Sequence, residues 1–190
     1  MGREFELKYA VKSVAVLEKI LEYIGRTAEE IRMATTYYDT ADGALSARKW
    51  TLRLRKENDD FVVTFKTAGD GKTRGEWEYN ADSVEFAATT LVDLGAPQEL
   101  EELLADGVQP VCGAEFTRRT VLLELGGTVA ELALDSGRLF RGEKEMPLCE
   151  MEVELKDGSE AAVRQFAENL AEKFGLVEEP RSKFVRAVNL

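Results

Sequence analysis

The most informative absence in this chain of 190 residues is histidine, of which there is none. A histidine general base, a Ser-His or Cys-His nucleophile and an HExxH zinc site are therefore excluded. Cysteine is scarce as well: Cys112 and Cys149 are far apart and lack zinc-ligand spacing, so we expect two reduced thiols. Chemistry in this chain has to use carboxylates, amines and guanidinium groups.

Long apolar runs are also missing, and none approaches the roughly 20 residues that span a bilayer. The first residues, Met1 to Glu6, contain no apolar signal core. The net charge is −11, from 25 basic and 36 acidic side chains, whereas a nucleic-acid binder needs a basic face against phosphates. We therefore predict a cytoplasmic protein with neither a membrane nor a nucleic acid as its partner.

The hydrophobic periodicity that is present predicts a single α+β domain over residues 1–190. Segments with period-two alternation or β-rich composition give about eight strands, joined largely by hairpin signals: 4–9, 35–39, 50–55, 61–66, 72–79, 115–125, 128–135 with a short piece near 138–140, and 148–155. Helical spacing and capping residues predict helices at 13–24, 82–94, 97–105 and 159–175. Glycine predicts helix ends at Gly25 and Gly175 and a turn at Gly137. Hairpin connections indicate an antiparallel sheet, and the helices within about 82–105 form a predicted insertion.

The alternation has an unusual feature: one face of strand after strand carries ionised residues of both signs, and the other face is apolar. The charged positions include Glu4, Glu6, Lys8, Arg53, Arg55, Lys66, Arg74, Glu76, Glu78, Glu150, Glu152 and Glu154. Two arrangements satisfy this pattern. An open sheet can turn its charged face to solvent, which periodicity alone slightly favours, or the sheet can curl so that this face lines an enclosed cavity.

The second arrangement has a chemical consequence, because acids and bases enclosed together must pair or bind ions. Carboxylates without histidine or cysteine are hard oxygen ligands that suit Mg²⁺ or Mn²⁺. Arg53 and Arg55 are two residues apart on a strand, so both guanidinium groups point the same way and match phosphate geometry.

An ordered set of short motifs resembles one family over nearly the whole chain. The motifs are Glu4-x-Glu6-x-Lys8, Tyr38-Asp39-Thr40, Leu52–Glu57, Thr64-Phe65-Lys66, Arg74-Gly75-Glu76-Trp77-Glu78, Phe116-Thr117-Arg118, Leu134–Gly137, Cys149–Leu155 and Ser182-Lys183. Together they are similar to the CYTH superfamily, also called triphosphate tunnel metalloenzymes. The resemblance implies an eight-stranded antiparallel closed β-barrel, and it favours the enclosed arrangement over the open sheet.

The resemblance also implies roles for individual residues. Metal binding is expected at Glu4, Glu6 and Glu152, and less firmly at Glu150 and Asp135. Phosphate contacts are expected from Lys8, Arg53, Arg55, Lys66, Arg74, Arg118 and Lys183. Arg118 and its neighbour Arg119 point in opposite directions, so the choice of Arg118 rests on the family pattern only.

The expected activity is hydrolysis of inorganic triphosphate or a small organic triphosphate with Mg²⁺ or Mn²⁺. One metal would bridge phosphate oxygens, and a second metal or a carboxylate such as Glu150 or Asp135 would position and deprotonate the water. Lys8 is expected to be catalytic together with Glu150 and Asp135. The alternatives are a class IV adenylyl cyclase, a thiamine triphosphatase and a non-catalytic polyphosphate- or nucleotide-binding module. A homodimer is compatible with the resemblance.

Some side chains have a second interpretation that the sequence leaves open. Glu154, at the strand end, suits a rim position as well as a ligand, and Glu76 and Glu78 suit the orientation of neighbouring bases. Trp50 and Trp77 fall on the apolar face of their strands, so we expect them in the outer packing and not as stacking platforms.

Overall fold

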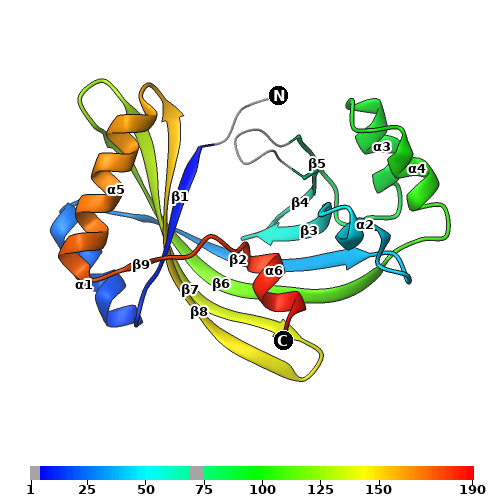
Figure 1. Cartoon of the computed structure of the whole chain (residues 1–190), viewed down its shortest axis with the longest axis horizontal. Coiled ribbons are helices and arrows are strands. Elements are labelled where there is room, and N and C mark those ends of the chain that lie inside the picture. The colour runs from blue at the N-terminus through cyan, green and yellow to red at the C-terminus, as the bar shows by residue number, and fades with distance from the viewer. Residues whose placement is uncertain (1–4, 69–74) are drawn as a thin grey trace.

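The computed structural model describes residues 5–68 and 75–190, and it shows one curved antiparallel sheet with helices packed on it (Figure 1). The strand order across the sheet is β5-β4-β3-β2-β6-β7-β8-β1-β9. The strands are β1 Glu6–Ala10, β2 Glu29–Asp39, β3 Thr51–Glu57, β4 Asp60–Lys66, β5 Glu76–Asn80, β6 Gln109–Glu124, β7 Val129–Arg141, β8 Lys144–Asp157 and β9 Val177–Glu178.

The predicted closed eight-stranded barrel is not what the hydrogen bonding forms. The sheet has nine strands, and in the described part of the chain its edge strands β5 and β9 pair only with β4 and β1. The two-residue strand β9 was not predicted, and it explains part of the difference. It pairs with Tyr9 and Ala10, and the N–H of Glu179 donates to the carbonyl of Lys8, so the outer edge of β1 is already used there.

The middle of the sheet contains longer strands than the sequence predicts, because β7 continues through Gly137. A turn was expected at Gly137, but this residue stays in register, opposite Phe116 of β6 and Leu148 of β8. A Cβ added there would lie 2.1 Å from the carbonyl oxygen of Glu115 and 2.5 Å from Cα of Phe116. Glycine at this position therefore permits a close approach of two strands, which is the other common meaning of glycine in a strand.

The helices follow the predicted segments closely. They are α1 Val14–Ile24, α2 Ala44–Ala47, α3 Ala87–Asp93, α4 Glu99–Leu103, α5 Glu160–Phe174 and α6 Lys183–Val188. Gly25 and Gly175 end α1 and α5 in the left-handed region, at φ 65° and 63°, as predicted from glycine at these positions. Asp82 was expected to begin a helix, but α3 begins five residues later, at Ala87. The short helices α2 and α6 were not predicted.

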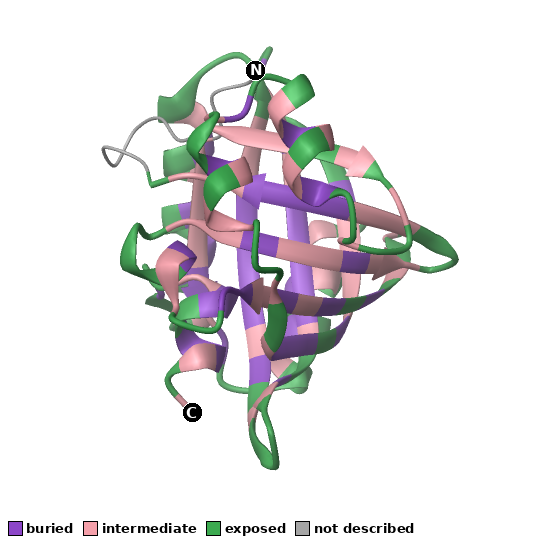
Figure 2. Cartoon of the chain, turned by 90° about the vertical axis from the view of Figure 1, so that its right-hand side faces the viewer, coloured by how far each residue is buried: buried purple, intermediate pink, exposed green. Residues whose placement is uncertain are grey.

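Two groups of helices, one at each end of the sheet, cover its convex side. Helices α1 and α5 bury an apolar cluster around Leu17, Ile20, Leu132, Met151 and Leu170. Helices α2, α3 and α4 cover a second cluster at the other end of the sheet, around Leu45, Leu52, Val63, Phe65 and Leu91. Figure 2 shows the buried positions concentrated on the strands and the exposed ones on loops and outer helix surfaces.

Helix α6 lies on the other, concave side of the sheet. Its Phe184 and Ala187 join a third apolar cluster with Met33, Tyr37 and Phe116 of β2 and β6. The concave face is therefore apolar where α6 packs and charged in the remaining stretch. No helix among the described residues is long and apolar enough to cross a membrane, and Cys112 and Cys149 are both free thiols.

Candidate functional site

A groove of about 760 Å³ occupies the charged part of the concave face, with contributions from β1 to β8 and from α6. The charged residues that line it, of both signs as the alternation predicts, are Glu6, Lys8, Arg53, Arg55, Glu57, Lys66, Glu76, Glu78, Arg118, Glu131, Glu152, Glu154, Lys156 and Lys183. The sheet is open, and its charged face lines one shared groove.

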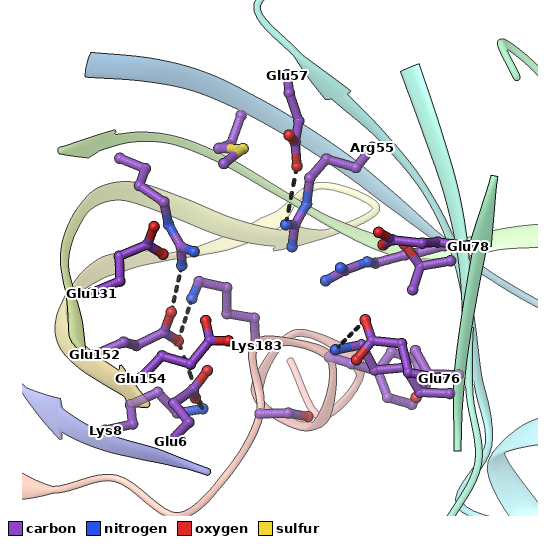
Figure 3. A pocket seen from close by; sticks show the side chains of 18 of the residues that line it. Glu6, Lys8, Arg55, Glu57, Glu76, Glu78, Glu131, Glu152, Glu154 and Lys183 are labelled. Carbon is purple, nitrogen blue, oxygen red and sulfur yellow. Dashed lines mark hydrogen bonds and ion pairs between the residues drawn. The ribbon is translucent and has the colours of Figure 1, made fainter. Parts of the chain in front are cut away.

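One side of the groove is formed by β1, β7 and β8, and we call it the carboxylate wall: Glu6, Lys8, Glu131, Glu152 and Glu154 (Figure 3). Strand register creates this wall, because Glu154 lies between Glu6 and Glu131, and Glu152 lies beside Lys8. The Nζ atom of Lys8 lies 3.6 Å from Oε1 of Glu6 and 3.9 Å from Oε1 of Glu152. Glu6, Glu152 and Glu154 thus share this wall from the adjacent strands β1 and β8, and Oε2 of Glu154 accepts from Nζ of Lys156 at 2.8 Å.

Lys183, the first residue of α6, holds a central position at the base of the carboxylate wall. Its Nζ atom lies 2.8 Å from Oδ2 of Asp135 and 2.9 Å from Oε1 of Glu152, and it also contacts Glu150. Ser182 positions this residue by capping α6: its hydroxyl oxygen accepts a hydrogen bond from the N–H of Val185 at 3.2 Å.

Two arginines complete this buried ionic cluster. Arg118 of β6 binds Asp135 through two hydrogen bonds of 2.8 and 2.7 Å, and the same guanidinium contacts Glu152. Arg186, one turn after Lys183 on α6, contacts Glu150. Sequence reasoning missed Arg186; its spacing of three residues from Lys183, on a helix begun by Ser182, was the available signal.

The pKa values in this cluster are far from ordinary. Burial opposes the charge on Lys183, but Glu152, Asp135 and Glu150 outweigh it, so the pKa of Lys183 is raised. Burial also opposes the charge on Glu152, yet Lys183, Arg118 and Lys8 hold its pKa well below the usual range. Burial dominates at Glu150, and its pKa is raised despite Lys183. The cluster therefore keeps Glu152 ionised and Lys183 protonated.

The opposite side of the groove is formed by β3 and β4, and we call it the guanidinium wall: Arg53, Arg55, Thr64 and Lys66. The Nε–H of Arg55 donates to Oγ1 of Thr35 at 3.1 Å, and its Nη1 lies 3.5 Å from Oε1 of Glu57. Burial, helped by the neighbouring charge of Arg53, lowers the pKa of Arg55 to about 10. This wall carries three positive charges, and the Nε atom of Arg53 has no hydrogen-bond partner among the described residues.

Beyond the guanidinium wall, β5 supplies the carboxylates of Glu76 and Glu78. Nζ of Lys66 lies 2.8 Å from Oε1 of Glu76, which agrees with the interpretation that Glu76 orients a neighbouring base; for Glu78 this stays a prediction. Trp50 and Trp77 lie on the outer face of the sheet, where both rings contact Phe65, as the sequence predicts.

The site can be tested for its fit to a divalent cation. Carboxylate oxygens of Asp135, Glu150 and Glu152 lie within 4.8 Å of one another, close enough to share an ion. The ammonium of Lys183 already contacts all three, so a cation there would have to displace it. Glu152 also lines the groove, as do Glu6 and Glu154 on the same wall, and their oxygens are of the kind that suits Mg²⁺ or Mn²⁺. These carboxylates have ammonium neighbours too: Lys8 lies 3.6 Å from Glu6, and Lys156 lies 2.8 Å from Glu154.

The structure brings most of the predicted site residues together. Those that line the groove are Glu6, Lys8, Arg53, Arg55, Lys66, Arg118, Glu152 and Lys183. Asp135 and Glu150 do not line it; both are fully buried beneath its surface. Arg119 points to the other side of the sheet and binds Glu18 of α1 at 2.8 Å. Glu4 and Arg74 lie outside the described residues.

The comparison with known families agrees with this geometry. A family model described as the CYTH domain matches residues 2–188. The chain belongs to the CYTH domain family. Among curated proteins, this CYTH domain is similar to an inorganic triphosphatase of Haemophilus influenzae, with 31% identity over 90% of the chain. The chain spans about half (50%) of the length of that relative.

Solved structures support the CYTH fold. A putative adenylyl cyclase from Hippeastrum, described as having a dominant triphosphatase activity, matches with a TM-score of 0.65 and 16% identity, covering 97% of this chain and 94% of that one. A putative adenylate cyclase from Vibrio parahaemolyticus matches with a TM-score of 0.58 and 18% identity, covering 99% and 98%. At such identities the likeness concerns the fold alone.

Proposed function

We propose that this CYTH domain binds inorganic triphosphate in the groove and hydrolyses it with the help of Mg²⁺ or Mn²⁺. The observation that carries the proposal is one groove with a carboxylate wall facing a guanidinium wall. A polyanion alone would need only the second wall, and a cation alone only the first. A metal-bound polyphosphate needs both, and the similarity to a curated inorganic triphosphatase supports this choice of substrate.

The guanidinium wall would hold the substrate's phosphoryl oxygens. Arg53 and Arg55 present their donors from one strand, and Lys66 adds a charge from the next. Charge-assisted hydrogen bonds from guanidinium groups to phosphate are among the strongest in proteins. Lys8, Arg118 and Lys183 would meet the other end of the substrate from across the groove. Spreading the anion between two walls fixes the phosphorus to be attacked in one position.

The carboxylate wall would hold the divalent cation through Glu6, Glu152 and Glu154, and Glu4 remains a predicted ligand. When bound, such a cation neutralises charge on the phosphate oxygens and lowers the pKa of a nearby water. The low pKa of Glu152 supports its part in this set, because an ionised carboxylate is the form that binds a cation.

The sequence suggested that Glu150 or Asp135 acts on the water. In this proposal the two carboxylates instead position the groups that line the groove. Asp135 fixes the guanidinium of Arg118 through two hydrogen bonds, and Glu150 holds Lys183 and Arg186. Neither carboxylate is among the residues that line the groove, which supports a positioning role for both. Lys8, between Glu6 and Glu152, would orient the cation's ligands and contact phosphate.

The lining of the groove favours a substrate without a nucleobase or other aromatic ring. The aromatic side chains among its described lining residues are Tyr37 and Phe184, and their rings pack on each other at 5.2 Å between centroids. Tyr37 is only 4% exposed and Phe184 only 9%, so neither ring presents an open face on which adenine or thiamine could stack. Cyclase and thiamine triphosphatase activities are accordingly outcomes that the assay below has to distinguish.

The decisive experiment gives purified protein inorganic triphosphate, ATP and thiamine triphosphate in parallel, with Mg²⁺ and then Mn²⁺. We expect phosphate release from inorganic triphosphate at a kcat/KM well above that for the other two, and none after chelation of the metal. Cyclic AMP as the main product would replace the proposal by a cyclase. Binding without turnover of any substrate would reduce it to a binding module.

A further inference from the structure

The guanidinium wall contains two buried hydrogen-bonding atoms that have no partner among the described residues: Oγ1 of Thr64 and Nε of Arg53. Thr64 has an exposed fraction of only 1%. Buried polar atoms in native proteins nearly always have a partner, and an unmade hydrogen bond costs free energy. Two orphaned atoms on neighbouring residues of one groove therefore require an explanation.

Thr64 is held firmly in this position. It pairs with Arg53 of β3 on one side and with Glu78 of β5 on the other, and it lines the groove together with both. Its chain neighbours Val63 and Phe65 are fully buried on the opposite face of the strand. A β-branched side chain on such a backbone has little freedom at χ1. The hydroxyl therefore cannot turn away from the groove to find water.

The chemistry of the two atoms indicates what is missing. The Nε–H of arginine can only donate a hydrogen bond, and in the described structure it does not donate to Thr64. The nearest carboxylate in register, that of Glu78, does not accept from the hydroxyl either. Both atoms thus lack an acceptor, and a single anionic oxygen between β3 and β4 would supply one to each.

We propose that the Thr64 hydroxyl and the Arg53 Nε–H together bind one phosphoryl oxygen of the substrate. The inference rests on the proposed function for the identity of the ligand, and it adds to that function a residue which no sequence pattern assigned. The unmet donors belong to the free protein and are satisfied on binding. The Thr64 hydroxyl therefore stabilises the complex with substrate and destabilises the free protein.

This predicts opposite effects in two measurements on Thr64→Val. Valine has the same shape without the hydroxyl, so we expect the Tm of the free protein to be unchanged or higher, because an unsatisfied polar atom is removed. Calorimetric titration with inorganic triphosphate, in EDTA to prevent turnover, should show binding weakened by about 10-fold to 100-fold. Thr64→Ser keeps the hydroxyl and should bind within about twofold of the wild type.

A double-mutant cycle sharpens the test. Arg53→Lys keeps the charge but removes the Nε–H, and if both donors meet one oxygen, Thr64→Val combined with Arg53→Lys should lose less affinity than the product of the single losses. Multiplicative losses would show that the two residues contact different oxygens. A lower Tm for Thr64→Val with unchanged affinity would show a structural role and overturn the proposal.

The inference and the proposed function can fail separately. If the wild type hydrolyses inorganic triphosphate and Thr64→Val binds it equally well, only the inference is wrong. If the wild type binds inorganic triphosphate in a Thr64-dependent way but never cleaves it, the subsite stands and hydrolysis does not. If the wild type binds neither triphosphate nor inorganic phosphate, both are overturned.

Discussion

The carboxylate wall and the guanidinium wall face the same groove, yet their charges are compensated in different ways. On the carboxylate wall, Glu152 contacts Lys183 and Arg118, and their ionised forms stabilise one another. On the guanidinium wall, burial and the charge of Arg53 lower the pKa of Arg55 to about 10, and Arg53 keeps a donor without a partner among the described residues. The first wall is assembled before any ligand arrives.

The difference shows where function acts against stability. Removing charges from water costs free energy, which close pairing can offset, as it does around Lys183. Arg53 and Arg55 are compensated less among the described residues: Arg55 lies 3.5 Å from Glu57, yet its pKa is lowered, and a bound anion would add compensation. We therefore expect substitutions on the two walls to have separable effects, with stability affected mainly on one side and binding on the other.

The largest expected effect belongs to Glu6→Gln on the carboxylate wall. Removing one negative charge from the proposed cation site should lower kcat/KM for inorganic triphosphate by about 100-fold to 1,000-fold, because transition-state charge is then poorly neutralised. Steady-state kinetics at several Mg²⁺ concentrations measure the loss. The Tm should change little, since Glu6 is only partly buried.

The matched control is Glu115→Gln, which also removes a carboxylate from a strand. Glu115 is half exposed and binds Arg138 outside the groove. Its rate should remain within about twofold of the wild type, as expected for an exposed ion pair. Wild-type kinetics in Glu6→Gln would refute the assignment of the cation to this wall.

The second prediction compares the walls directly, through Arg55→Met and Arg118→Met. Both should lower kcat/KM by about 10-fold to 100-fold, since each loses a charged hydrogen bond to phosphate. Only Arg118→Met should lower the free energy of unfolding, by about 3 kcal/mol, because Asp135 and Glu152 lose a buried partner. Arg55→Met should keep its stability, because a repelling charge is removed.

Urea denaturation and kinetics on the two variants separate these effects. An equal loss of stability in both variants would show that charges on the two walls are compensated to the same extent. The proposed difference between the walls would then be wrong. A stable Arg118→Met would mean that Lys183 alone compensates Asp135 and Glu152.

Much of the fold could be predicted from local patterns. Alternation gave the charged face, and glycines with a left-handed backbone marked the ends of α1 and α5. What local patterns miss is long-range geometry. Gly137 has the composition of a turn but serves a close strand approach, and β9 exists only because β1 offers it an edge.

The same limit applies to the site. Parity identified which side chains face the groove, but not how deep each one lies. Glu150 and Glu152 share a face, yet α6 covers Glu150 and leaves Glu152 in the groove. Thr64 belonged to a family-like motif, but the sequence assigned it no role, because a missing hydrogen-bond partner becomes visible only when the surrounding atoms are placed.

A third prediction uses the low pKa of Glu152. Its folded pKa lies well below the ordinary value of 4.5, so between these two values the unfolded chain binds one more proton. Stability should therefore fall as the pH decreases below about 4.5, by about 1.4 kcal/mol per pH unit for this one group. The raised pKa of Glu150 acts in the opposite sense and above 4.5, so the two windows do not overlap.

Urea denaturation between pH 6 and pH 3 (a window chosen around about 4.5) tests this, with Glu152→Gln and Glu115→Gln side by side. The acid-side slope should shrink by about one proton in Glu152→Gln and match the wild type in Glu115→Gln. An unchanged slope in Glu152→Gln would place the titrating group elsewhere on the molecule.

The smallest expected effect is that of Arg119→Gln, and its value lies in the contrast with Arg118. The two arginines are adjacent on β6, and strand alternation sends them to opposite sides of the sheet. Arg119 binds the half-exposed Glu18 of α1, a kind of ion pair that contributes roughly 0 to 1 kcal/mol to stability. Its substitution should leave kcat/KM within about twofold of the wild type. A loss comparable to that of Arg118→Met would mean that the sheet presents its other face to the substrate.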